Sequence, residues 1–190
     1  MVLNIPNFLT LLRIVMIPVL VVVFYVPFPK HLLVAATIFG LAAVTDWFDG
    51  YLARRLGQTT KFGAFLDPVA DKLMVAVALV LLVERHDTQL FTLAACVIIG
   101  REIVVSALRE WMAELGERTS VAVSYIGKVK TVFQMIAITA LLAIDPRADP
   151  GWLLALSYLV LYSAAALTLY SMIVYLKAAW AIIRQQDNPL

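Results

Sequence analysis

The sequence contains one cysteine, two histidines and few charged residues. The single Cys96 excludes an internal disulfide and any cysteine cluster for zinc or redox chemistry. It lies in an apolar run, where we expect a small buried hydrophobic side chain. His31 and His86 fall in predicted loops on the side of the membrane away from the acidic motif described below. Carboxylates, rather than a histidine, are therefore expected to do the acid–base work.

Only 15% of the 190 residues are charged, whereas 63% are hydrophobic and the mean hydropathy is +0.91. A soluble domain has about half apolar residues and about a quarter charged ones. The composition therefore predicts an all-α integral membrane protein with several spans. The chain shows no internal repeat, low-complexity segment or linker, so residues 1–190 are expected to form a single domain with no nucleic-acid partner.

The apolar runs predict six transmembrane helices, separated by polar turns at 27–31, 84–89 and 145–150. A short interfacial helix carrying Asn7, Thr10 and Arg13 is expected before the first span. Arg13 either extends to the lipid headgroups from the end of that span or acts directly on lipid or substrate. Residues 110–120 are expected to form an amphiphilic helix that leaves the membrane. The predicted spans are 14–26, 32–54, 63–83, 90–109, 121–144 and 152–181.

The distribution of basic residues predicts the orientation of the spans. The three turns named above contain only Lys30, Arg85 and Arg147, so the other twelve of the fifteen basic residues lie at or near the opposite side. Basic residues are enriched in cytoplasmic loops. Both termini, and the acidic motif that lies on the same side, are therefore expected to be cytoplasmic.

The most informative stretch is residues 46–71, where four aspartates stand among apolar neighbours. Asp46 and Asp49 lie on one face of a helix, and Asp67 and Asp71, four residues apart, share a face of the next. Residues 57–60 interrupt the apolar run and allow the chain to reverse. The spacing therefore predicts a helix hairpin in which the two carboxylate pairs face one another.

Four clustered carboxylates repel one another unless positive charge lies among them. Hard oxygen ligands at this density suit Mg²⁺, Mn²⁺ or Ca²⁺. The geometry favours Asp46, Asp49 and Asp67 as ligands, whereas Asp71 could both share a metal and approach a substrate hydroxyl. The structural alternative is simple charge pairing of the aspartates with basic side chains, the candidates being Arg54, Lys72 and Arg101.

This stretch resembles the signature of the CDP-alcohol phosphatidyltransferase family at every fixed position. The pattern is Asp, two residues, Asp-Gly, two residues, Ala-Arg, eight residues, Gly, three residues, Asp, three residues, Asp. Eight fixed identities at fixed spacing make the resemblance specific. The matching positions are Asp46, Asp49, Gly50, Ala53, Arg54, Gly63, Asp67 and Asp71.

The resemblance implies a metal-dependent phosphatidyl transfer from CDP-diacylglycerol. Two divalent cations, Mg²⁺ or Mn²⁺, are implied on Asp46, Asp49, Asp67 and Asp71, with Asp71 as the general base. The resemblance implies that the small residues Gly50 and Ala53 leave room for the cytidine nucleotide. Close helix packing is an alternative explanation of these two residues. Gly63 is expected to permit a tight entry into the third span. The predicted CDP-diacylglycerol site comprises Gly50, Ala53, Arg54 and Thr60.

Stretches outside the motif resemble the branch of the family that uses sn-glycerol 3-phosphate as acceptor. They are residues 4–13, 101–111 and 127–131, so the likeness covers nearly the whole chain. The guanidinium groups of arginines can form paired hydrogen bonds with a phosphate. The resemblance also implies a homodimer in the bacterial cytoplasmic membrane. Topology and headgroup contact are the alternative explanation of the basic residues. The predicted acceptor site comprises Arg101, Arg109, Arg118, Lys128 and Lys130.

Two alternatives remain open from the sequence. The acceptor could be serine, inositol phosphate or phosphatidylglycerol, because the aspartate motif does not distinguish among acceptors. A divalent-cation transporter would also bury carboxylates among helices, although it would more naturally hold them near the midplane at a repeat interface.

Overall fold

The computed structural model describes residues 5–56, 60–114, 125–148 and 151–187. Within these ranges the chain forms six α-helices and no strand, which confirms the predicted all-α class. The helices follow one another with short connections, as long apolar runs separated by polar turns predict. They are α1 (Ile5–Tyr25), α2 (His31–Leu56), α3 (Lys61–His86), α4 (Gln89–Glu114), α5 (Tyr125–Ala143) and α6 (Trp152–Asp187).

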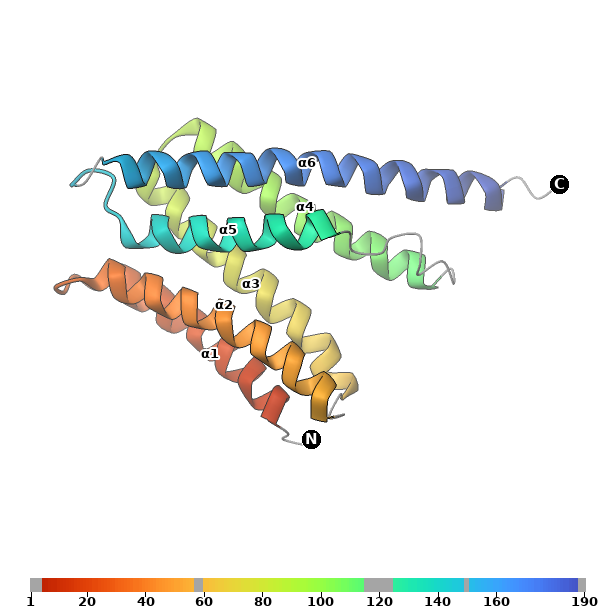
Figure 1. Cartoon of the computed structure of the whole chain (residues 1–190), viewed down its shortest axis with the longest axis horizontal. Helices are drawn as coiled ribbons and strands as arrows, with labels where there is room; N and C mark the ends of the chain where they lie inside the picture. Colours follow the sequence, from red (N-terminus) through yellow and green to blue (C-terminus); the bar gives the residue numbers. More distant parts are fainter. Residues whose placement is uncertain (1–4, 57–59, 115–124, 149–150, 188–190) are drawn as a thin grey trace.

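The helices pack in a connected bundle (Figure 1). Helix α1 packs on α2 and α3, α2 packs on α5, and α6 covers α4 and α5. Large apolar side chains fill the interior, and Phe39, Leu79 and Phe91 are fully buried. Burial of this kind orients the polar residues at one end of the bundle, because each helix is held by at least two neighbours.

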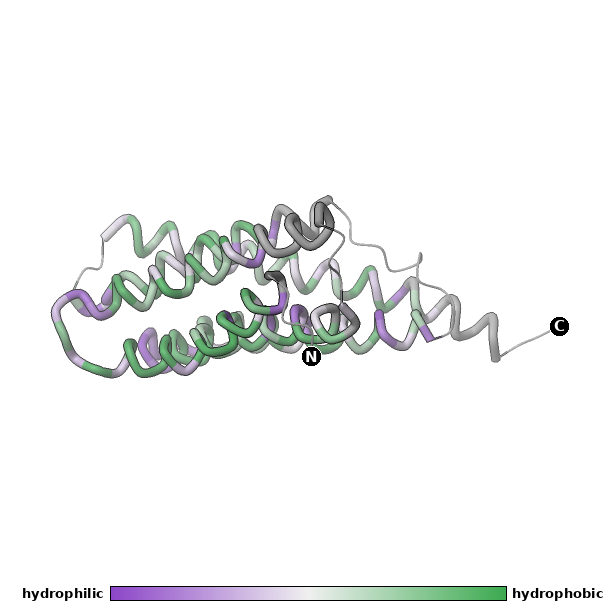
Figure 2. The backbone as a smooth tube through the Cα atoms, turned by 90° about the horizontal axis from the view of Figure 1, so that it is seen from below, coloured by the Kyte–Doolittle hydropathy of each residue, from purple (hydrophilic) through white to green (hydrophobic). Residues whose placement is uncertain are grey.

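Hydrophobic residues predominate along the lengths of the helices (Figure 2), and many of the large ones are exposed on the outer surface. Three helices, α1, α4 and α6, contain stretches long and apolar enough to cross a membrane. Helices α2 and α5 contain shorter apolar stretches, His31–Asp46 and Lys130–Ala143. Exposed Trp152 and Tyr170 belong to this surface, whose composition suits lipid rather than water.

Two expectations about local structure, the separate interfacial helix and the buried Cys96, are wrong. Helix α1 runs without a break from Ile5, so a separate interfacial helix does not precede the first span. Helix α4 runs without a break through Arg109 to Glu114, so the described part of the expected 110–120 helix continues the fourth predicted span. Cys96 is exposed rather than buried, because it lies on the outer face of α4. Apolar periodicity did not reveal which face of α4 meets neighbouring helices.

The three short connections lie together at one end of the bundle. Arg85 at the end of α3 pairs with Asp145 after α5 (Nη2–Oδ2 2.9 Å), and its guanidinium lies 5.6 Å from the centre of the Phe24 ring. Tyr25 at the end of α1 donates a hydrogen bond to Glu84. These contacts tie α1, α3 and the α5–α6 connection together, and the acidic motif lies toward the other end.

Candidate active site

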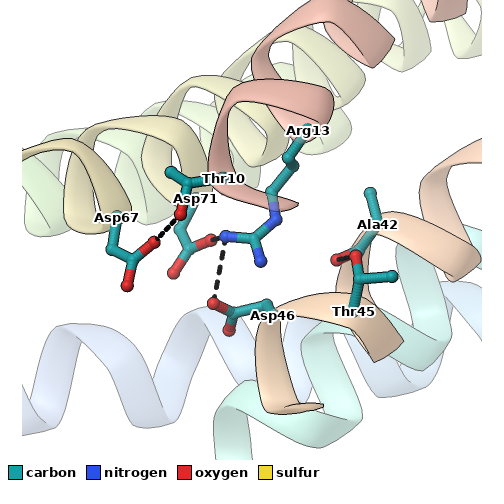
Figure 3. A network of polar contacts seen from close by, with 7 residues as sticks. All are labelled: Thr10, Arg13, Ala42, Thr45, Asp46, Asp67 and Asp71. Atoms are coloured by element: carbon teal, nitrogen blue, oxygen red, sulfur yellow. Dashed lines mark hydrogen bonds and ion pairs between the residues drawn. The ribbon is translucent and has the colours of Figure 1, made fainter. Parts of the chain in front are cut away.

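Three of the four predicted aspartates converge around an arginine (Figure 3). Asp46 lies on α2, whereas Asp67 and Asp71 lie on α3. One nitrogen of Arg13, Nη1, lies 2.5 Å from an Asp71 oxygen and 3.1 Å from an Asp46 oxygen. The two carboxylates are 37% and 41% exposed, but the arginine that joins them is only 1% exposed. Helices α2 and α3 thus bring Asp46 close to Asp67 and Asp71, with the Arg13 guanidinium between Asp46 and Asp71 (Figure 3).

The cation is delivered by a polar face of α1. Asn7, Thr10 and Arg13 follow at three-residue intervals, which places them within about 120° of arc on one side of the helix. All three are buried. Thr10 donates its hydroxyl hydrogen to Asp67, and Asn7 contacts Thr60 at the start of α3. The snorkelling interpretation of Arg13 is therefore wrong, because the side chain points into the bundle toward the motif.

Gly63 of the motif is explained by this same face of α1. Thr60 is the N-cap of α3, and its hydroxyl accepts a hydrogen bond from the Gly63 backbone N–H at 3.0 Å. The Asn7 amide nitrogen lies 3.0 Å from the same hydroxyl. A β-carbon on Gly63 would lie 2.3 Å from Asn7 Oδ1, so only glycine leaves room for this contact. Thr60 thus has a helix-capping task, and its predicted contact with CDP-diacylglycerol stays a prediction.

The donor set at this site fits a hard divalent cation. Carboxylate oxygens are the preferred ligands of Mg²⁺ and Mn²⁺, and the position between Asp46 and Asp71 already attracts a positive group. Among the described side chains, however, no three acidic, histidine or cysteine residues are close enough to hold a metal as they stand. The three carboxylates are suitable metal ligands, but their oxygens contact Arg13 and Thr10 of α1.

A second polar cluster lies on α4, α5 and α6. Lys130 is only 2% exposed, and its Nζ lies 3.2 Å from the Ser171 hydroxyl. The charges of Arg101, Arg109 and Glu102 all act on the Lys130 ammonium. Buried Arg101 also pairs with Glu102. The structure therefore brings together three of the five residues that the sequence predicted for the acceptor.

The α6 residues of this cluster were not found from the sequence. Ser171 contacts Lys130, and the Tyr175 ring lies 6.0 Å from the guanidinium carbon of Arg109. Both positions lie in a long apolar helix, where a serine or tyrosine carries no distinctive local signal. Their spacing of four residues on one helix face was the available clue, but it does not identify the facing residues.

The carboxylate cluster and the Lys130 cluster lie at similar positions along the length of the bundle, on the same side of the contact between α2 and α5. Gly40 on α2 faces Thr139 on α5, where a β-carbon would be 3.5 Å from the threonine methyl. Asp46 is six residues beyond Gly40 and Lys130 is nine residues before Thr139. At 1.5 Å per residue, these positions lie about 9 and about 13.5 Å from the shared contact, in the same direction because α2 and α5 run antiparallel (Figure 1).

Several predicted site residues lie beyond what the structure describes. Helix α2 includes positions 49, 50, 53 and 54, and α5 includes position 128, but those side chains are outside the described part. Arg118 lies outside the described residues altogether. Predictions that remain for these residues concern Asp49, Gly50, Ala53, Arg54, Arg118 and Lys128.

Comparisons with known proteins find similarity along almost the whole chain. The family described as CDP-alcohol phosphatidyltransferase matches residues 3–170. A Yersinia pestis (strain Pestoides F) protein named CDP-diacylglycerol–glycerol-3-phosphate 3-phosphatidyltransferase is 58% identical over 179 residues, covering 94% of this chain and 96% of that protein. Proteins of the same name from Salmonella choleraesuis and Pectobacterium atrosepticum are 57% and 58% identical, each over 93% of this chain and 94% of the relative. With its whole acidic motif inside the matched region, the chain belongs to the CDP-alcohol phosphatidyltransferase family.

Proposed function

We propose that this protein transfers the phosphatidyl group of CDP-diacylglycerol to sn-glycerol 3-phosphate, forming phosphatidylglycerol phosphate and CMP. The observation that carries the proposal is the pairing of two sites at similar depth. Asp46, Asp67 and Asp71 converge on one side, and a buried basic cluster around Lys130 lies on the facing helices. Relatives 57–58% identical along almost their whole length bear the name of this reaction.

In the proposed reaction a free hydroxyl of the acceptor attacks the phosphorus that bears the diacylglycerol. The bond from that phosphorus to the CMP oxygen breaks, and CMP leaves with the electron pair. Asp71 accepts the hydroxyl proton, as a carboxylate does when it is within hydrogen-bond reach of the nucleophile. Asp71 lies on α3 beside Asp67 and across from Asp46 (Figure 3), which supports this proposed role.

Asp46, Asp49, Asp67 and Asp71 would hold Mg²⁺ or Mn²⁺, proposed as two ions per site. When bound, the metal neutralises the diphosphate oxygens and favours departure of CMP. The chain's own contribution is to keep the carboxylates within reach of one another on two packed helices. Gly50, Ala53 and Arg54 follow on α2 and would accommodate the cytidine diphosphate portion.

The acceptor phosphate would bind the basic cluster of Arg101, Arg109 and Lys130, with Arg118 and Lys128 as further proposed contacts. A buried lysine among two arginines is unfavourable unless an anion neutralises the group. Glu102 neutralises one of the three charges, which leaves a net positive site among the described residues. A doubly charged phosphate monoester suits this site better than zwitterionic serine. The names of the relatives, rather than the charge, favour glycerol 3-phosphate over inositol phosphate.

We further propose six spans with both termini and the active site on the cytoplasmic side of the bacterial inner membrane, and a homodimer. The gathering of the three short connections at one end of the bundle supports an up-and-down arrangement of the spans. The excess of basic residues toward the other end supports the orientation.

The test is CMP release by purified full-length protein with CDP-diacylglycerol and Mg²⁺. Glycerol 3-phosphate, serine, inositol phosphate and phosphatidylglycerol would be supplied separately, and each lipid product identified by mass spectrometry. We expect turnover with glycerol 3-phosphate and with none of the other acceptors, and we expect a chelator to abolish it. Turnover with another acceptor would overturn the acceptor assignment while keeping the phosphatidyl transfer.

Two variants separate the proposed roles. Asp71→Asn is expected to lower kcat by more than about a hundredfold, because the amide cannot accept the proton. Lys130→Met is expected to raise KM for glycerol 3-phosphate more than KM for CDP-diacylglycerol. Metal binding without turnover with any acceptor would instead favour a cation-binding or transport protein.

A further inference from the structure

We propose that Arg13 is the resident counter-ion of the carboxylate site and competes with the divalent cation for Asp46 and Asp71. This inference rests on the proposed metal site. A single guanidinium nitrogen lies 2.5 Å from an oxygen of Asp71 and 3.1 Å from an oxygen of Asp46. It therefore occupies the position between α2 and α3 that a cation bridging the two carboxylates would take.

The arginine is held at this place by its helix. Its side chain is buried, and two other polar residues on the same face of α1 bind the start of α3 and the adjacent carboxylate. Asn7 reaches Thr60, and Thr10 reaches Asp67. Helix α1 packs along both α2 and α3, so movement of the guanidinium requires a change of side-chain conformation rather than departure of the helix.

A divalent cation bound to the same two carboxylates would lie close to the Arg13 guanidinium. Each is positive, and at ion-pair distances in partly buried surroundings they repel strongly. The aspartates, in turn, repel one another when neither cation is present. Arg13 therefore keeps the carboxylates together before metal binds, and metal loading must release it. It is a positioning residue that lowers metal affinity in exchange for a stable metal-free site.

The test measures Mn²⁺ binding to purified full-length protein without substrates. The electron paramagnetic resonance signal of free Mn²⁺ reports how much of the ion remains unbound. Arg13→Gln removes the competing charge and is expected to lower the Kd for Mn²⁺ at least about fivefold, within the usual range of coupling between sites. Arg13→Lys keeps a charge on a shorter stem and is expected to fall between Arg13→Gln and the wild type. Arg85→Gln is the matched control, because it breaks an arginine–aspartate pair at the opposite end of the bundle; its Kd is expected to equal the wild-type value.

Thermal unfolding gives a second readout that a merely structural role would not move. Arg13→Gln is expected to lose more stability without Mn²⁺ than with it, whereas Arg85→Gln is expected to lose the same amount in both conditions. Unchanged or weaker Mn²⁺ binding in both Arg13 variants would overturn the competition. Should Arg13→Gln not fold, the Kd of Arg13→Lys decides alone. A wild-type protein that binds no Mn²⁺ would instead refute the proposed metal site itself.

Discussion

Replacing Gly63 by alanine tests how α1 is attached to the acidic motif. In an ordinary helix the change is favourable by about 1 kcal/mol, because alanine has the higher helix propensity. Here the new β-carbon would lie 2.3 Å from Asn7 Oδ1 and 3.1 Å from Thr60 Oγ1. Asn7 is buried and must therefore move away from its hydroxyl partner.

The expected cost follows from the contacts that are lost. The hydrogen bond between Asn7 and Thr60 is worth about 1 kcal/mol, and a stranded buried amide costs about 1–3 kcal/mol more. Less the helix gain of about 1 kcal/mol, the net loss is about 1–3 kcal/mol. For a chain of this length that corresponds to a fall in Tm of roughly 2–12 °C. Intrinsic tryptophan fluorescence of detergent-solubilised protein during heating measures it.

Two further proteins make the reasoning refutable. In an Asn7→Ala background the obstacle is absent, so Gly63→Ala is expected to be neutral or stabilising there. Gly100→Ala on α4 is the matched control, because its β-carbon would meet nothing within 4 Å and should not lower Tm. Equal destabilisation by Gly63→Ala with and without Asn7 would show that Asn7 is not what requires the glycine.

Three other outcomes are expected from the described contacts. Ser171→Ala removes the hydroxyl beside Lys130. It is expected to raise KM for glycerol 3-phosphate roughly threefold to tenfold, the equivalent of about 1 kcal/mol, and to leave KM for CDP-diacylglycerol unchanged. An equal effect on both substrates would contradict the acceptor assignment. Tyr175→Leu removes the ring next to Arg109, and we expect a two- to fivefold rise in KM for glycerol 3-phosphate. Tyr175→Phe keeps the ring face and should have the wild-type KM. The Arg147 backbone N–H and the Arg85 guanidinium lower the pKa of Asp145. The stabilisation from this carboxylate is therefore present above its unfolded pKa of about 4 and is lost as pH falls through the folded pKa. Asp145→Asn should remove that part of the acid dependence of Tm, and an unchanged Tm profile would refute the assignment.

Local features of the chain determined the helices and the aspartate hairpin. Apolar runs of bilayer length between polar turns are readable without tertiary information, because the period of a helix is a property of adjacent residues. The spacing of Asp67 and Asp71 likewise placed both on one face of α3. The motif also sufficed to predict the family that the comparisons show. The number of spans, the orientation and the roles of individual residues remain proposals.

Only the tertiary structure decided which side chains meet across helices. Arg13 was visible in the sequence, but its partner Asp71 lies 58 residues away, and helix periodicity does not say which faces pack together. The requirement for Gly63 depends on Asn7 of another helix, and the support of Lys130 comes from Ser171 on α6. Exposed Cys96 shows the same limit in reverse, because in an apolar chain hydrophobicity does not distinguish the outer surface from the interior. Long-range packing sets these contacts, and no local pattern encodes them.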